Sequence, residues 1–160
     1  MRSGKLVAVL IGAALPIFGM QAVPAVSAAA TNGQKARAIE SVVTALFAAL
    51  RQGNYTAACN DYTPDVRGLV TEAATKLTGK SFTTCGSALA AIYDLTPTID
   101  ARLRKLGAPR YSNLVIKGRT ATITYTSTVG NLVARSDIDV KYLSRRWLVG
   151  RATSLTFTKR

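Results

Sequence analysis

Few residues in this 160-residue chain could do chemistry. It has no histidine, two cysteines, six tyrosines and eight Asp or Glu side chains. Without histidine, Ser-His-Asp and Cys-His nucleophilic sites and histidine general bases are excluded. The sequence also contains no GxGxxG, phosphate-binding loop or HExxH motif. Acid–base work would fall to carboxylates, tyrosines or lysines, and we assign no catalytic residue, metal ligand or cofactor.

Tyr55 and Tyr62 are the aromatic candidates for a binding site, because they flank Cys59 near the ends of expected helices. They could line the mouth of a pocket, although partly buried packing is the commoner role for tyrosines in such positions. Asp137 and Asp139 alternate with apolar residues, so both should leave the core face together. Solvent exposure therefore explains these two carboxylates better than catalysis does.

The N-terminus has the three zones of a secretory signal. A cationic start at Arg2 and Lys5 precedes an uncharged run at 6–20, and small residues follow at 21–30. This order is typical of a signal peptide, here residues 1–28. The apolar run is shorter than the ~20 residues that a membrane span needs. We expect residues 29–160 to form one domain, secreted or associated with the cell envelope, with no transmembrane anchor after cleavage.

Cys59 and Cys85 can form only one intramolecular disulfide. A cysteine pair in an exported chain is usually oxidised. Redox and metal alternatives lack support, because CxxC spacing is absent and no histidine could complete a zinc site. We predict a structural bridge that stabilises the fold by roughly 3–4 kcal/mol in the chain-entropy model.

The first half of the mature chain has helical periodicity. One helix should start at Thr31 or Asn32 and stop at Gly53, with an apolar stripe that includes Ile39, Val43, Leu46 and Leu50. Thr63-Pro64 and Thr96-Pro97 indicate an N-cap followed by proline at the first helical position. The helix after Pro64 should bury Val66, Leu69, Val70, Ala73 and Leu77, and another should carry Cys85.

After Pro109 the apolar period changes to two. Strands are expected at 113–116, at 120–128, around Ile138 to Tyr142, and from Trp147 to Phe157. Four strands with short links predict an antiparallel meander, with Trp147 in the core. Threonines at alternate positions from 120 to 128 should form a solvated face or a hydroxyl-lined surface for a glycan or partner. The fold class is α+β, with N-terminal helices packed on one face of a curved sheet.

Three stretches carry a family resemblance: "AALRQGNYTAACNDYTP", "CGSALAAI" and "LVIKGRTATITYTS…IDVKYLSRRWLVGRA". From about Gln34 to Phe157 the chain resembles exported bacterial members of the nuclear transport factor 2-like (cystatin-like, ketosteroid isomerase-like) superfamily. The resemblance implies a cone-shaped fold, in which helices plug one end of a strongly curved sheet and leave a conical pocket. Enzymes of the superfamily place carboxylates or tyrosines in that cone, but none of those residues can be carried over to this sequence.

The chain is strongly basic, with a net charge of +13. Arg2 and Lys5 are the only charged residues of the signal, so 19 basic and 8 acidic residues remain after cleavage, a charge of +11. Anionic cell-wall polymer or lipid headgroups are the expected partners of such an exported protein, and nucleic acid is not. A charged solvated surface with no specific partner is the alternative. Candidate contact residues are Arg102, Lys105, Arg145, Arg146 and Arg151.

These observations favour a secreted, non-catalytic accessory or binding domain. The alternative is a small-molecule enzyme of the isomerase, dehydratase or hydrolase type, using a carboxylate or tyrosine in the cone pocket. A cone filled by side chains such as Phe47 and Trp147 would favour the binding domain. A deep apolar pocket in which a buried aspartate of raised pKa faces a tyrosine would favour the enzyme. The oligomeric state is left open.

Overall fold

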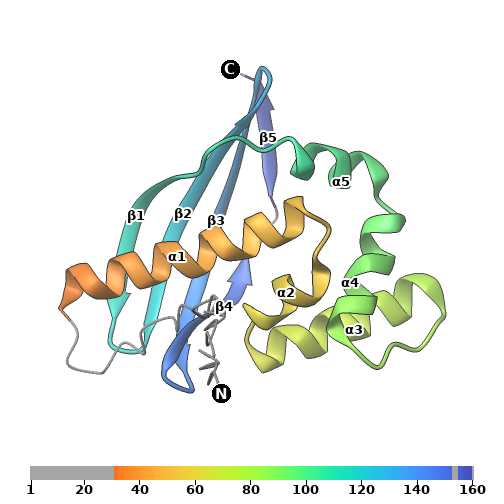
Figure 1. Ribbon diagram of the computed structural model, residues 1–160, viewed down its shortest axis with the longest axis horizontal. Helices are drawn as coiled ribbons and strands as arrows, with labels where there is room; N and C mark the ends of the chain where they lie inside the picture. Colours follow the sequence, from red (N-terminus) through yellow and green to blue (C-terminus); the bar gives the residue numbers. More distant parts are fainter. Residues whose placement is uncertain (1–30, 153–154, 160) are drawn as a thin grey trace, which may run out of the picture.

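The computed structural model describes residues 31–152 and 155–159, and the predicted signal segment lies outside them. Within the described part, helices precede an antiparallel sheet, as the α+β prediction requires (Figure 1). The helices are α1 (Asn32–Arg51), α2 (Tyr55–Asn60), α3 (Pro64–Thr78), α4 (Cys85–Asp94) and α5 (Pro97–Arg104). The strands are β1 (Arg110–Lys117), β2 (Thr120–Val129), β3 (Leu132–Leu143), β4 (Arg146–Ala152) and β5 (Thr156–Lys159).

The helix boundaries follow the predicted caps. Thr31 begins α1 with a capping box, in which its hydroxyl accepts from the Gln34 backbone and its own N–H donates to Gln34 Oε1. Pro64 occupies the first turn of α3, and Gly79 ends that helix in the left-handed region at φ +69°. The predicted α1 stripe is confirmed by its buried apolar residues, Ile39, Val43, Leu46 and Leu50.

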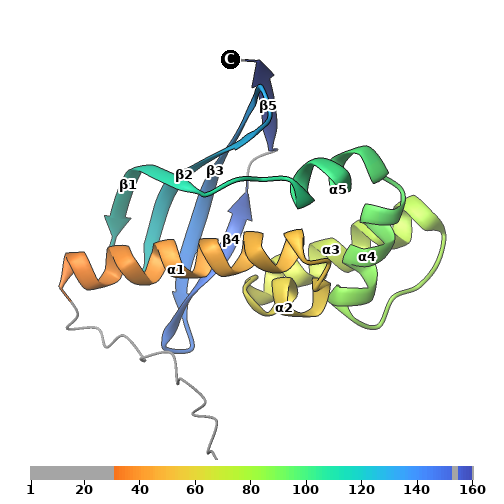
Figure 2. The same ribbon diagram turned by 45° about the horizontal axis from the view of Figure 1, so that its top comes forward.

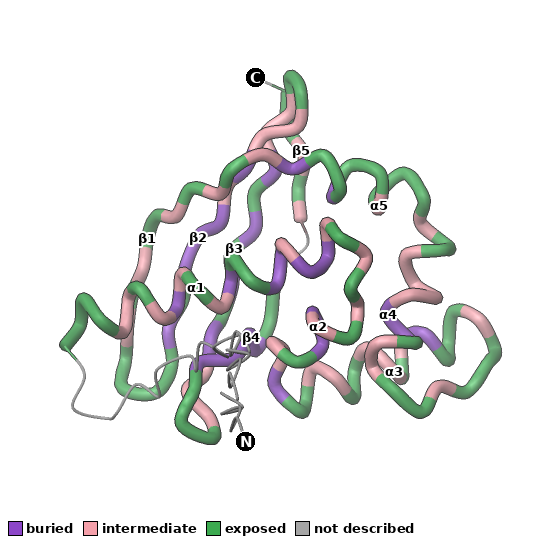
Figure 3. The backbone as a smooth tube through the Cα atoms, in the orientation of Figure 1, coloured by how far each residue is buried: buried purple, intermediate pink, exposed green. Residues whose placement is uncertain are grey.

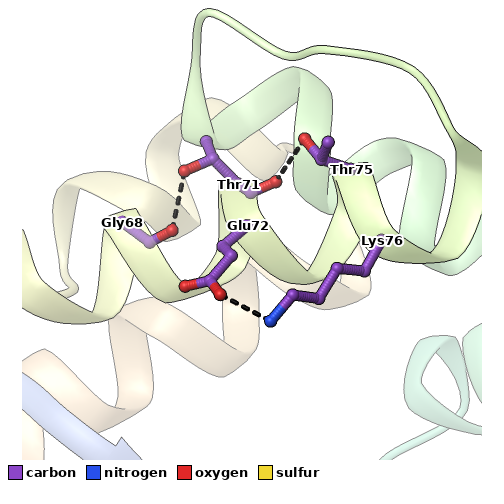
Figure 4. Close-up of polar contacts among 5 residues, drawn as sticks. All are labelled: Gly68, Thr71, Glu72, Thr75 and Lys76. Carbon is purple, nitrogen blue, oxygen red and sulfur yellow. Dashed lines mark hydrogen bonds and ion pairs between the residues drawn. The ribbon is translucent and has the colours of Figure 1, made fainter.

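The predicted stripe of α3 is correct only in part: Val66, Val70 and Ala73 are half-buried, and Val70 packs against the core. Leu69 and Leu77 are 56% and 63% exposed, whereas Ala74 is fully buried. The helix packs mainly against α4, and the small Ala74 side chain lies on its buried side. The rest of α3 carries local polar contacts (Figure 4): Thr71 and Thr75 hydroxyls bond to preceding carbonyls, and Lys76 Nζ lies 2.6 Å from Glu72 Oε1.

The sheet order is β1-β2-β3-β4, and β5 pairs with β3. The predicted four-strand meander is therefore incomplete, because the last run divides into two strands. β4 pairs with Ile138–Leu143 of β3, and β5 pairs with residues 132–135 of the same strand. β3 has 12 residues, so its two halves can serve two shorter strands.

Helix α1 crosses one face of the curved sheet (Figures 1 and 2). Buried segments lie where α1 meets the sheet and in the α2 and α4 region (Figure 3). Phe47 of α1 stacks on Tyr125 of β2 with ring centroids 3.9 Å apart. Trp147 is 5% exposed and packs against Tyr142, so its predicted core position is confirmed.

The face of the sheet opposite α1 is more polar, but it is only partly solvated. Asp137 and Asp139 are exposed, as their parity predicts. Thr124 is only 4% exposed, which corrects the expectation of a fully solvated threonine row. Its hydroxyl donates to Asp137 Oδ1 and accepts from Asn113 Nδ2. Asn113 lies at a bulge in β1 with φ +52°.

The predicted Cys59–Cys85 disulfide is present. It joins the buried end of α2 to the first residue of α4, with a Cα–Cα distance of 5.9 Å. Gly86 lets the two helices approach closely, because a Cβ at this position would lie 2.8 Å from Thr56 Oγ1 and 3.2 Å from Thr56 Cα. The bridge thus fixes α2 to α4 within the helical part of the domain.

Candidate cationic groove and surface

Helix α5 positions two of the predicted cationic residues. Pro97 fixes its first turn, and the buried Leu103 and Leu106 hold its C-terminal end against the core. The helical repeat of 3.6 residues places Pro97, Ala101 and Lys105 on one side, with Arg102 beside them. This side of α5 faces the end of the β2–β3 hairpin and forms an open groove with it.

The groove has a volume of about 530 Å³. Its apolar lining consists of Pro97, Ala101, Val129 and Leu132, and its cationic lining consists of Arg102 and Lys105. Thr98 completes the set given by the described residues, which includes no carboxylate. The groove lining thus combines apolar side chains, which we call its floor, with cationic side chains, which we call its edge.

Hydrogen bonds between the segment after α5 and β2 hold the two walls together. The Gly107 N–H donates to the Thr128 carbonyl at 2.9 Å, and the Ser127 hydroxyl donates to the Gly107 carbonyl at 3.0 Å. A Cβ at Gly107 would lie 3.3 Å from the Thr128 carbonyl oxygen, so this approach favours glycine. Sequence reasoning missed the groove, because this contact joins residues far apart in the chain.

The single carboxylate of α5 faces away from the groove. Asp100 Oδ2 accepts from Arg104 Nε at 2.7 Å, and Asp100 Oδ1 accepts from the Tyr55 hydroxyl at 3.2 Å. Because Arg104 and Tyr55 bind both oxygens of Asp100 on that side, the charge of Arg102 and Lys105 is not compensated by their own helix.

Strand β5 adds an aromatic ring and a further cation. The Arg102 guanidinium lies 5.3 Å from the centroid of the Phe157 ring. Lys159 pairs with Leu132 across the β3–β5 ladder, so the two side chains project from the same face of the sheet. Phe157 and Lys159, two residues apart, share that face. The cationic edge therefore extends from α5 onto β5.

The predicted pocket-mouth residues lie elsewhere, at the junction of α2, α4 and β4. Tyr55 stacks on Tyr93 with ring centroids 5.3 Å apart, and Tyr62 forms an isolated bridge with Val149. Burial, reinforced by the charge of Asp61, raises the pKa of Tyr62 to about 12. Burial also raises the pKa of Tyr93. These phenols stay protonated at neutral pH and can donate hydrogen bonds but cannot act as bases.

Asp61, at the end of α2, is a partly buried carboxylate at the same junction. Burial raises its pKa, and the nearby Arg146 guanidinium partly offsets that effect. Its backbone carbonyl accepts from the Val149 N–H at 2.8 Å, which ties the end of α2 to β4. Sequence reasoning did not single out Asp61, because its burial depends on β4 reaching α2.

The other predicted cationic residues lie away from the groove. Arg145 lies in the β3–β4 turn and Arg146 is the first residue of β4. This turn is at the opposite end of β3 from the β2–β3 turn (Figure 1). Arg146 Nη2 donates to the Asn60 carbonyl at 2.7 Å. Arg151 is exposed and pairs in register with Asp139. At about 3.3 Å per residue, the length of β3 separates the two ends by roughly 35–40 Å.

Comparison of the chain with models of known families, with curated proteins and with solved structures finds no match in any of the three. Over residues 31–152 and 155–159, no helix has the length and apolar character that crossing a bilayer requires. The same residues include no cluster of three or more potential metal ligands among Cys, Asp and Glu.

Proposed function

We propose that this chain is an exported, non-catalytic accessory or binding domain of the nuclear transport factor 2-like type, which associates with anionic cell-wall polymer or lipid headgroups. The observation that carries the proposal is the distribution of its cations. Arg102 and Lys105 lie at one end of the sheet, and Arg145 and Arg146 lie at the other. Such a surface suits an extended anionic partner better than a small charged ligand.

The energetics of this arrangement favour diffuse association. Exposed charges are screened beyond roughly 8 Å at physiological salt. The two ends of the sheet therefore contribute independently, each adding to the attraction for a polyanionic surface and to the association rate. No single pair of cations should determine binding.

The packing between α1 and the sheet supports a non-catalytic role. Phe47 is 8% exposed and stacks on Tyr125, which is itself 1% exposed. These rings fill space between the helix and the sheet, where the superfamily resemblance would place a conical pocket. Trp147 fills a neighbouring part of the interior.

One observation favours the alternative, a small-molecule enzyme using a carboxylate and a tyrosine. Asp61 has a raised pKa and directly precedes Tyr62, so the two groups interact electrostatically. If this alternative is correct, Asp61→Asn should abolish turnover of a small-molecule substrate while leaving the fold intact.

The proposal is tested by comparing two charge-neutral double variants. Arg102→Gln/Lys105→Gln and Arg145→Gln/Arg146→Gln should each weaken retention on anionic vesicles only partly. The quadruple variant should lose approximately the sum of the two free-energy changes, because the pairs are well separated. Complete loss of retention with either double variant alone would contradict diffuse association.

Export is tested separately by intact mass spectrometry of the protein recovered from the medium or envelope. The expected species begins at Ala29 and lacks two hydrogens relative to the reduced chain. Recovery of full-length chain starting at Met1 would contradict the proposed compartment.

A further inference from the structure

The groove between α5 and the β2–β3 hairpin has an apolar part and a cationic part. A polyanion held by diffuse electrostatic attraction would not use both parts together. Its floor is apolar, from Ala101 on the helix and from Val129 and Leu132 on the hairpin. Its edge is cationic, from Arg102 and Lys105. A polymer of anionic groups would need only the edge, whereas a neutral lipid would need only the floor.

The only carboxylate of α5 does not neutralise this cationic edge. Asp100 is bound by Arg104 and Tyr55 on the opposite side of the helix. Arg102 is positioned by its contact with the Phe157 ring, and Lys159 projects from the same sheet face as Leu132. Cations from two elements therefore flank one end of the apolar floor.

The size of the groove limits the occupant. Small-molecule sites typically measure ~300–1,000 Å³, and the groove, at about 530 Å³, falls within that range. An open groove of this kind covers one side of an extended chain and leaves the other in solvent. A single hydrocarbon chain with one anionic head matches both parts of this lining, the apolar floor and the cationic edge.

We propose that this groove binds one molecule of a single-chain anionic amphiphile of the fatty-acid type. The carboxylate head contacts Arg102 and Lys105, with Lys159 near enough to contribute. The hydrocarbon chain lies along Ala101, Val129 and Leu132. This site is additional to the diffuse association proposed above and does not depend on it.

The experiment uses dodecanoate as the probe, below its micelle concentration, with the mature domain in calorimetric and NMR titrations. We expect one bound molecule per chain and shifts of the Ala101, Val129 and Leu132 methyl signals. Acetate supplies the head without the chain, and dodecyl maltoside supplies the chain without the charge. Each should bind at least about tenfold more weakly, the loss expected when ~1.4 kcal/mol of head or chain contact is removed.

Two variants separate the chain contact from the head contact. Ala101→Trp fills the groove without changing charge and should abolish binding of dodecanoate, whereas Ala45→Trp, at an exposed position of α1, should not. Arg102→Gln/Lys105→Gln should weaken binding about tenfold. The matched control, Lys80→Gln/Lys117→Gln, removes the same charge from exposed positions outside the groove lining and should change affinity less than about twofold.

The outcomes distinguish this site from the diffuse surface. If Ala101→Trp loses dodecanoate but keeps its retention on anionic vesicles, both proposals stand. If dodecanoate fails to bind the wild-type chain, or shifts signals only outside the groove, the groove proposal is wrong whatever the vesicles do. Should Ala101→Trp fail to fold, the methyl shifts in the wild-type chain and the paired charge variants still decide the question.

Discussion

Removing the Cys59–Cys85 bridge should destabilise the domain by an amount that its loop length sets. The two residues are 26 positions apart, and the chain-entropy model then gives about 3.5 kcal/mol at 25 °C. We would replace both residues with alanine, because Cys59 is 4% exposed and a serine hydroxyl there would be buried without a planned partner.

The assay is urea unfolding of the oxidised wild-type domain and the Cys59→Ala/Cys85→Ala variant, followed by far-UV circular dichroism. The variant should lose about 3–4 kcal/mol of unfolding free energy and show a steeper denaturant dependence, since its unfolded chain is less compact. The free energy of unfolding of a domain is typically only ~5–15 kcal/mol, so the loss should clearly lower the urea concentration at the unfolding midpoint. A loss below about 1 kcal/mol would refute the reasoning that the bridge acts chiefly on the unfolded state.

Three further predictions concern packing and titration. Phe47→Ala should cost about 3–5 kcal/mol in thermal or urea unfolding, because it opens a cavity between α1 and the sheet; an unchanged midpoint would show that the interior is not filled as described. Gly86→Ala should destabilise the domain by about 1–3 kcal/mol, because its Cβ would lie 2.8 Å from Thr56 Oγ1, and a neutral effect would mean that Thr56 can shift away without cost. Carboxyl NMR should find the pKa of Asp61 above its usual range, through burial, and that of Glu72 below its own, through the Lys76 hydrogen bond. The stability contributed by Asp61 should then be present at acidic pH and lost as pH rises through its folded pKa, and the opposite order would contradict its burial.

Local signals in the sequence predicted much of the fold. Thr31 predicts the start of α1 because its side chain caps the helix, and Pro64 predicts the start of α3 because its φ angle is fixed. Both effects depend on only a few neighbouring residues. The cysteine pair allowed only one bridge. The change from helical to strand period at Pro109 located the sheet, because periodicity reflects one buried face per element.

Features that depend on distant partners could not be predicted in the same way. Leu69 and Leu77 continue an apolar pattern in α3, yet the face that α4 covers is the one holding Ala74. The pairing of β5 with β3 requires a break in the last apolar run that periodicity does not show. The predicted disulfide placed α2 beside α4, but it did not show that Tyr55 stacks on Tyr93.

The candidate site was predicted in its composition but not in its shape. Arg102 and Lys105 were identified from the excess of basic residues alone. Their groove exists because Gly107 bonds to Thr128 and brings α5 against the end of β2. The hydrogen bond from Tyr55 to Asp100 is likewise a tertiary contact, since Tyr55 comes from α2.

The most direct test of the proposed association with anionic surfaces is its dependence on salt. Retention of the mature domain would be measured on anionic vesicles and on anionic cell-wall polymer from low to moderate ionic strength, with neutral vesicles as the control. Because the charges are exposed and spread over both ends of the sheet, retention should fall steeply as the screening length shortens to roughly 8 Å. Retention that is unchanged by salt, or equal on neutral vesicles, would contradict the account.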